Sequence, residues 1–202
     1  GVQAASTLTV SGGSLTITDS YEGLEAADIE IAGGTTRVTS SDDGLNAASD
    51  TATPVICITG GVLIVDASGD GLDSNGSLRM SGGVVLVSGP TNDGNGALDY
   101  DTQAVITGGV LIAAGSTGMA QNFDSSSTQA SWLASCTGSA GTSLTLVDSD
   151  GSVLVSWTPA KSYSCAVISC PAMAQGSSYT LLTGGTCADA DADGYADSGT
   201  VS

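Results

Sequence analysis

The sequence contains no histidine, and only three basic residues, Arg37, Arg79 and Lys161, stand against 21 acidic ones. The formal charge of −18 argues against nucleic acid and anionic membranes as partners, because both are bound through clustered Lys and Arg. No nucleophile elbow, phosphate-binding loop or redox motif is present. A calcium-assisted polyuronate lyase would need one of the three basic side chains as its proton acceptor. We therefore expect a protein that is not an enzyme.

Aromatic residues and long apolar runs are also scarce. The chain has two Trp, five Tyr and one Phe, and we expect Trp132 and Trp157, which lie in the C-terminal part, to pack against the β-helix. No run of 18 apolar residues is present, so we expect no membrane insertion. Gly1 in place of Met suggests a mature chain whose signal peptide has been removed, which predicts a secreted protein of the extracellular space or cell surface.

The five cysteines show no zinc-type CxxC spacing. In a secreted protein this number predicts two disulfides and one remaining thiol, free or intermolecular. The sequence does not determine the pairing. The candidates are Cys57, Cys136, Cys165, Cys170 and Cys187.

What the chain does contain is a repeat. Five Gly-Gly pairs lie 21 to 27 residues apart, each between two segments of alternating apolar residues. A repeat of this length predicts an all-β solenoid in which each unit forms one coil. Each pair should form a corner between two strands, where a bend or a positive φ is needed. The pairs begin at Gly12, Gly33, Gly60, Gly82 and Gly108.

Alternation around the glycines predicts which side chains face the core. Positions two and four before and after each pair are mostly aliphatic, and period-two alternation places them inward in stacked ladders. Their neighbours then face outward, and these include Arg37 and Arg79. In the later coils, however, the outward positions after the glycines are apolar, namely Val62, Ile64, Val84, Leu86, Val110 and Ile112.

Such an outward apolar stripe must be covered by something. One candidate is a neighbouring protomer. The other is the chain itself, because residues 130–185 are expected to form antiparallel strands, including a hairpin over 143–157 with its turn at Asp148–Gly151. We divide the chain into β-helix coils (1–129), a C-terminal antiparallel β segment packed on one face (130–187) and an acidic tail (188–202).

Acidic turns recur at the same place in successive coils. Their alignment predicts one column of Glu22, Asp43 and Asp70 and a second of Glu25, Asn46, Asp73 and Asp99; we call these seven residues the acidic ladder. Coils stack about 4.8 Å apart, so neighbouring carboxylates repel by roughly 1 kcal/mol per pair in water. A hard cation between them would relieve this repulsion, and the oxygen ligands available suit Ca²⁺. Alternatively, these are ordinary turn residues of an acidic surface, or an adaptation to salt.

The tail holds a second calcium candidate. Asp189, Asp191 and Asp193 precede Gly194 in the DxDxDG pattern that begins an EF-hand loop. Position 12 is Thr200 in place of the bidentate Glu, and no flanking helices are evident. The segment is therefore either an incomplete calcium loop or a flexible acidic tail.

Several of these segments resemble a family of secreted bacterial and archaeal carbohydrate-binding domain-containing proteins. The resemblance covers roughly residues 5–185 and is carried by the strings YEGLEAADIEIAGG, SDDGLNAASD, GDGLDSNGSLRMSGGVVLVSGPTNDGNGALDYD and ITGGVLIAAGSTGMAQ. It implies a right-handed parallel β-helix, similar in shape to calcium-dependent pectate lyases, with bound Ca²⁺ and adhesion to plant-type polysaccharide. The calcium ligands that it implies are Glu22, Glu25, Asp42, Asp43, Asn46, Asp70, Asp73, Asp99 and Asp101.

Two functions remain open from the sequence. A β-helix without caps exposes unpaired strand edges at both ends, and the uncharged segment Gly1–Ser11 could add as a strand to a neighbour or simply form the first strand. This favours a calcium-stabilised structural protein that assembles end to end into filaments, to which Cys57 could add a cross-link. The alternative is a monomeric adhesin that binds extracellular polysaccharide, with Tyr21 and Tyr100 stacking on sugar rings. A lyase-like enzyme is a distant third.

Overall fold

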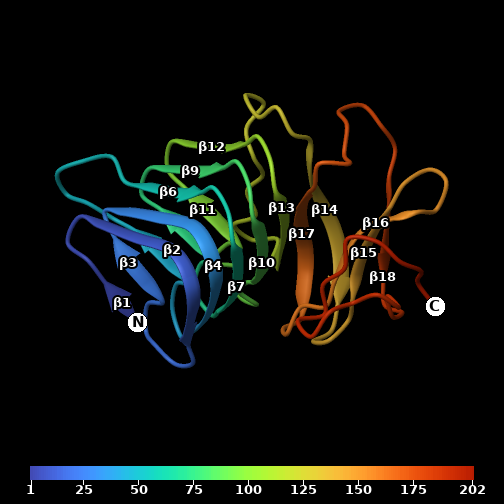
Figure 1. Ribbon diagram of the computed structural model, residues 1–202, viewed down its shortest axis with the longest axis horizontal. Coiled ribbons are helices and arrows are strands. Elements are labelled where there is room, and N and C mark those ends of the chain that lie inside the picture. Colours follow the sequence, from blue (N-terminus) through green and yellow to red (C-terminus); the bar gives the residue numbers. More distant parts are fainter.

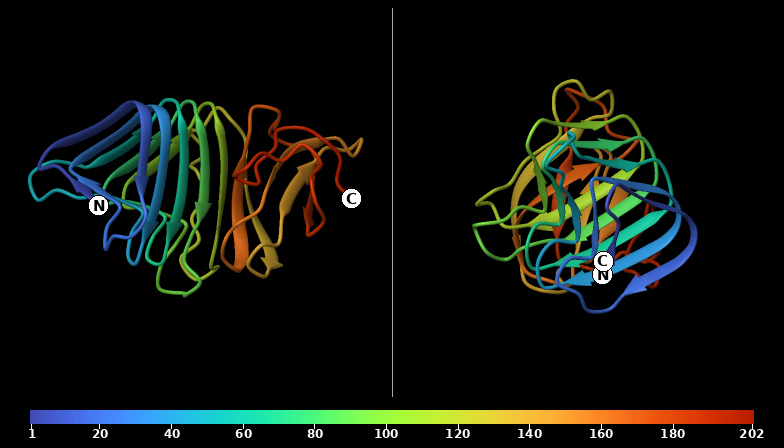
Figure 2. Two further views of the ribbon diagram at one scale, coloured as in Figure 1. Left: turned by 60° about the horizontal axis from the view of Figure 1, so that its bottom comes forward. Right: turned by 90° about the vertical axis from the view of Figure 1, so that its left-hand side faces the viewer.

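A computed structural model describes all of residues 1–202, which form eighteen β-strands. The N-terminal strands stack in parallel as a β-solenoid of about 4 turns, and antiparallel strands follow at the other end (Figures 1 and 2). The predicted fold class is confirmed. No helix in the structure is long and apolar enough to cross a membrane.

One face of the solenoid is a parallel sheet of very short strands in the order β1-β3-β5-β8-β11. Each coil contributes one strand, and Leu24, Leu45, Leu72 and Leu98 align in register and are fully or almost fully buried, as predicted. The strands are β1 (Val2–Gln3), β3 (Leu24–Ala26), β5 (Leu45–Ala47), β8 (Leu72–Ser74) and β11 (Leu98–Tyr100).

The other two faces meet at the Gly-Gly corners. The two longest strands continue through the corner, whereas later coils have a separate strand on each side of it. The second glycine of every pair has a positive φ, between 77° and 91°. A Cβ on Gly34 would lie 2.5 Å from the carbonyl oxygen of Gly13 in the preceding coil, so the close stacking of the coils requires glycine here. The strands are β2 (Thr7–Ile17), β4 (Asp28–Ser40), β6 (Val55–Ile58), β7 (Val62–Ala67), β9 (Ser77–Met80), β10 (Val84–Ser88), β12 (Gln103–Ile106) and β13 (Val110–Gly115).

The C-terminal part continues one of these faces and then covers it. An antiparallel strand β17 (Tyr163–Ser169) pairs with β13, and β14 (Ser131–Gly138) pairs with β17. A separate sheet has the order β16-β15-β18, formed by β15 (Leu144–Val147), β16 (Val153–Trp157) and β18 (Thr180–Thr183). The pairing of β15 with β16 confirms the predicted hairpin.

The molecule has two hydrophobic cores. The inner core of 27 buried residues fills the solenoid with the predicted inward ladders. The outer core lies between the solenoid and the C-terminal sheet, where Leu86 and Ile112 of the apolar stripe pack with Leu144, Val155 and Trp157. Both stripe residues are only 1% exposed. The chain itself therefore covers the stripe, as one of the two alternatives predicted.

The last coil is capped, which corrects the expectation of unpaired edges at both ends. The edge of β12 is closed by the segment that follows β13, because Asp124 N donates to Ala104 O (2.8 Å) and Asp124 Oδ2 accepts from Ala104 N (2.9 Å). In the same way Tyr100 N of β11 donates to Gln121 Oε1 (2.9 Å). The sequence contains no capping helix to signal this arrangement, because side chains of an irregular segment provide the cap.

The prediction of two disulfides is wrong, because all five cysteines are free. Cys57 lies on β6, far in sequence from the other four. Cys165 and Cys170 belong to one extended segment and are separated by about 16 Å, beyond the reach of a disulfide. Cys136 lies on the neighbouring strand β14, but the Cys165 thiol donates to Ser116 O. Cys187 lies in the tail, and its thiol donates to Ser198 O.

Candidate functional site

The acidic ladder lies on the outer side of the short-strand sheet and in the turns that precede it. Strand register aligns Glu25, Asn46, Asp73 and Asp99 across β3, β5, β8 and β11. The preceding glycines stack in the same way, since Gly23 N donates to Asp43 O and Gly44 N donates to Asp70 O. Period-two alternation turns the Leu residues of these strands inward and the acidic ladder outward.

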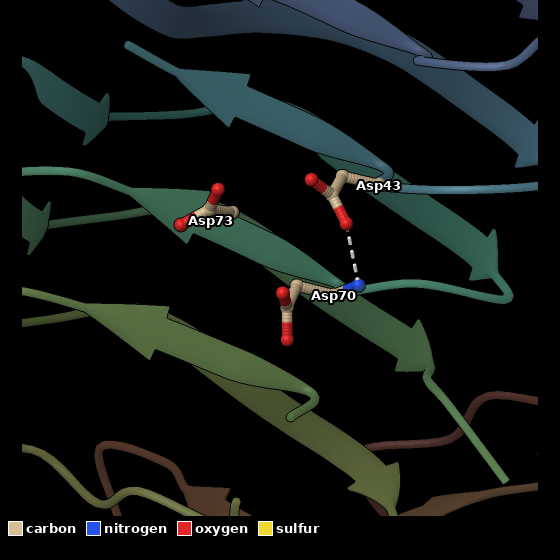
Figure 3. A group of neighbouring side chains, drawn as sticks. All are labelled: Asp43, Asp70 and Asp73. Atoms are coloured by element: carbon tan, nitrogen blue, oxygen red, sulfur yellow. Dashed lines mark hydrogen bonds between the residues drawn. The ribbon is translucent and has the colours of Figure 1, made fainter. Parts of the chain in front are cut away.

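Three carboxylates of this ladder converge. Asp43, Asp70 and Asp73 each offer one oxygen, and these oxygens lie within 4.8 Å of one another. Figure 3 shows that the three side chains come from two successive coils, Asp43 from one and Asp70 and Asp73 from the next. The backbone ties the cluster together, because Asp43 Oδ1 accepts from Asp70 N (2.7 Å) and Asp70 Oδ1 accepts from Gly96 N (2.6 Å).

Burial makes the negative charge of this cluster costly. Burial, together with the neighbouring carboxylates, raises the pKa of Asp73 to about 7 and that of Asp70 to about 6. The same causes raise the pKa of Glu22 to about 7, and burial also raises the pKa of Asp43. The two ion pairs of the molecule join Arg37 to Asp193 and Lys161 to Asp66, so neither neutralises the acidic ladder.

The two columns of the acidic ladder continue one coil earlier. The strand register aligns Glu22 with Asp43, Asp43 with Asp70, and Asn46 with Asp73. The residues Glu22, Asp43 and Asn46 therefore occupy the positions equivalent to Asp43, Asp70 and Asp73. Glu22 Oε2 and Asn46 Oδ1 are both buried without a hydrogen-bond partner. In the following coil the first column ends, because Gly96 occupies the position equivalent to Asp70. The second column continues with Asp99.

The residues present fit a calcium ion. Ca²⁺ takes six to eight oxygen ligands from carboxylates, amide carbonyls and backbone, and three carboxylate oxygens converge here. Two further oxygens of the acidic ladder are buried and unpartnered, which costs free energy unless a donor or cation satisfies them. Asp43, Asp70 and Asp73 would hold one ion, and Glu22, Asp43 and Asn46 would contribute to a second.

The remaining acids named by the family resemblance lie around this centre. Glu25, Asp42 and Asp99 are partly buried and Asp101 is exposed. Glu25 and Asp99 extend the second column at its two ends. Burial also raises the pKa of Asp99. The structure therefore concentrates the predicted ligands at the second and third coils.

The two tyrosines predicted to bind sugar differ in their surroundings. Tyr21 is 70% exposed on the first acidic turn, and a hydrogen bond to Asp42 raises the pKa of its hydroxyl. Tyr100 is partly buried against the inner core, and its hydroxyl donates to Asn122 O (2.6 Å). Tyr100 thus belongs to the cap of the solenoid, whereas Tyr21 has a free ring face.

The aspartates of the tail serve the fold. Both carboxylate oxygens of Asp193 accept from Arg37, at 2.6 and 2.8 Å. Asp191 Oδ1 accepts from Asp193 N and Tyr195 N. The bonds of Asp193 hold the tail against Arg37 of the second coil, 156 residues away in sequence, and those of Asp191 shape the turn of the tail itself. They engage both carboxylate oxygens of Asp193 and one of Asp191, whereas the carboxylate of Asp189 makes no hydrogen bond.

Sequence reasoning missed one feature that could bind a ligand. Trp157 is buried, as expected, but Trp132 is 37% exposed and lines a cavity of about 630 Å³ between the cap and the segment after β17. No signal in the sequence distinguished the two tryptophans. No protein-family model, curated protein or solved structure matches the chain.

Proposed function

We propose that this protein is a non-enzymatic, calcium-stabilised structural protein of the extracellular space that assembles end to end into filaments. The observation that carries the proposal is a continuous sheet with an open, uncharged strand at each end. This sheet runs from β2 through β4, β7, β10, β13 and β17 to β14. Beyond these pairings, neither β2 nor β14 makes a backbone hydrogen bond.

The two open strands have matching direction. All strands from β2 to β13 are parallel, and two successive antiparallel pairings, β13 with β17 and β17 with β14, restore the original direction. A second copy whose β2 paired with β14 would therefore run parallel to it, which is the relation between neighbouring coils. This copy would lie beside the C-terminal sheet, which extends beyond β14 along the solenoid axis and contacts it through β18 (Figure 1).

The composition of the open strands also supports pairing. Soluble proteins usually protect sheet edges with charges or proline, yet β2 and β14 contain neither, in a chain of net charge −18. Each strand also has an incompletely buried aliphatic residue in contact with the inner core, Leu15 on β2 and Leu133 on β14. Pairing of the two strands would bury these side chains further.

Calcium would act by neutralising the acidic ladder. Filament formation concentrates a strongly negative chain, and bound cations reduce the repulsion between copies. The basic residues support the absence of catalysis, since Arg37 and Lys161 are held in ion pairs. Arg79 is exposed on β9, on a different face from the acidic ladder.

Electron microscopy and sedimentation of the purified chain, in millimolar calcium and in chelator, test the proposal. We expect filaments in calcium. A charge on either open strand, as Thr16→Lys or Ser135→Lys, should abolish them, whereas Gln103→Lys on the capped strand β12 should not. Monomers in both conditions would refute assembly. Filaments of unchanged length and stability in chelator would refute the role of calcium alone.

A further inference from the structure

The cavity beside Trp132 lies between two segments that are distant in sequence. One is the cap and its continuation into β14, residues 122–132, and the other follows β17, residues 173–179. Figure 1 shows them as the yellow and orange-red segments at the top of the molecule. At about 630 Å³, the cavity falls within the usual range of small-molecule sites.

Aromatic and aliphatic surface forms part of its lining. Trp132 is 37% exposed, and the ring of Tyr179 is half-buried. Phe123 and Met173 are buried and add apolar surface. The face of an aromatic ring carries partial negative charge, and the indole of tryptophan attracts cations most strongly. The lining therefore favours a ligand that combines apolar surface with positive charge.

The only charged residue of the lining is acidic. Asp124 is partly buried, and one of its carboxylate oxygens accepts from Ala104 N (2.9 Å). No basic residue neutralises Asp124, because both ion pairs of the molecule involve other carboxylates. An anion in this cavity would lie beside a negative charge without a counter-charge. The net charge of −18 also raises the local concentration of cations at the surface.

A fixed amide adds a hydrogen-bond acceptor to the lining. Gln129 Nε2 donates to Gly109 O (2.9 Å) and to Ser169 Oγ (2.8 Å). These two bonds orient the amide, and Oε1 receives no donor from the chain. An acceptor that has lost water and has no donor costs free energy. A positively polarised group of a ligand at Oε1 would recover it.

We infer that this cavity binds an alkylammonium ion, with the ring of Trp132 contacting the cationic group and Asp124 supplying the counter-charge. Ammonium groups bind to the faces of aromatic rings, most strongly where water is excluded. The alkyl carbons of such an ion match the apolar surface of Phe123 and Met173. This site is separate from the acidic ladder, and the inference depends neither on calcium nor on filament assembly.

Calorimetry of the full chain in chelator tests the inference, in about 0.15 M sodium chloride to screen general attraction to the negative surface. The probes are choline and n-butylammonium. Their neutral counterparts are n-butanol and the carbon analogue of choline, in which a tert-butyl group replaces the trimethylammonium group. We expect at least one cation to bind, and its neutral counterpart to bind about tenfold more weakly or less, because only the cation is attracted by the ring face and the carboxylate. Binding of choline would identify a quaternary ammonium ligand, and binding of n-butylammonium alone a primary amine such as a lysine side chain.

Variants of the two central residues locate the site. Trp132→Ala should weaken binding by about tenfold or more, and Trp132→Phe, which keeps a ring, by less. Asp124→Asn keeps an oxygen that can accept from Ala104 N but removes the charge, so it should weaken binding by about fivefold. The matched control is Tyr21→Ala, which removes a 70% exposed ring beside Asp42, outside the cavity, and should leave binding unchanged.

Circular dichroism melting establishes that each variant folds, and Trp132→Phe and Asp124→Asn keep the test valid if Trp132→Ala does not. Three results would each overturn the inference. They are that neither cation binds, that the neutral counterparts bind as tightly as the cations, or that Tyr21→Ala abolishes binding while the Trp132 and Asp124 variants do not.

Discussion

Aspartates in two regions of this molecule have opposite surroundings. In the acidic ladder, Asp70 and Asp73 face other carboxylates, and burial with this repulsion raises their pKa values. In the tail, Asp193 pairs with both nitrogens of Arg37, and Asp191 accepts two backbone N–H groups. The same side chain therefore opposes the fold in one region and supports it in the other. Four predictions test this contrast, in order of decreasing effect.

Calcium should stabilise the protein through the acidic ladder alone. At a calcium concentration of 100 times the dissociation constant, binding to the native state contributes about 2.7 kcal/mol, which raises the melting temperature by about 5–10 °C for a chain of this size. Scanning calorimetry in calcium and in chelator measures this shift. Replacing Asp43, Asp70 and Asp73 together by Asn should abolish it, while Asp189→Asn with Asp191→Asn should preserve it. If the calcium-induced rise in melting temperature disappeared only in the Asp189→Asn, Asp191→Asn variant, the calcium site would lie in the tail and not in the acidic ladder.

Without calcium, stability should fall as the pH rises from about 4 to about 7. Unfolded carboxyl groups titrate near pH 4, whereas the folded pKa values of Asp73 and Glu22 are about 7. The folded state therefore binds more protons in this window, and raising the pH removes that advantage. Urea denaturation at several pH values in chelator measures the slope. The change of the free energy of unfolding with pH should be smaller in the variant with Asn at positions 43, 70 and 73. An equal change would mean that the groups that titrate lie outside the acidic ladder.

The same substitution should have opposite signs in the two regions. In chelator, Asp73→Asn removes repulsion from the neighbouring carboxylates and should raise the free energy of unfolding by about 1 kcal/mol. Asp193→Asn breaks the ion pair with Arg37 and should lower it by about 0.5–1 kcal/mol. Both values follow from urea denaturation at neutral pH. Equal signs would mean that the ladder carboxylates are not under electrostatic strain.

Arg37→Lys should have the smallest effect. The arginine donates from both terminal nitrogens to the two oxygens of Asp193, and a lysine keeps the charge but not this paired geometry. Because the pair is partly exposed, we expect a loss of about 0.5 kcal/mol or less. Thermal melting in chelator detects it. A loss as large as that of Asp193→Asn would show that the paired geometry, rather than the charge, holds the tail.

Much of the solenoid could be predicted from the sequence because its determinants are local. The Leu24 to Leu98 ladder follows from period-two alternation, and corners such as Gly34 follow from glycine at positions that need a positive φ. For the candidate calcium site, the sequence predicted which residues form the two columns, and the strand register places Asn46 beside Asp73 accordingly. The convergence of Asp43, Asp70 and Asp73 depends on the twist and depth of the turns, which alternation does not describe.

Features that depend on distant contacts could not be predicted. The cap uses Gln121 and Asp124, polar residues of an irregular segment whose partners become apparent only when the last coil is built. The exposure of Trp132 beside the buried Trp157 likewise depends on how the C-terminal segments pack. All five cysteines are free, including Cys136 and Cys165 on the paired strands β14 and β17, and cysteine number and spacing do not describe where each thiol lies.

The sequence alone determined the repeating coil, the inward-facing ladders of aliphatic side chains and the alignment of the acidic turns. Each of these depends on residues a few positions apart and on a register that repeats from coil to coil. Only the tertiary structure decided which carboxylates converge, which end of the solenoid is closed and where a cavity forms. These depend on contacts between segments up to 156 residues apart. Their free energies are set by burial and by hydrogen bonds that local patterns do not encode.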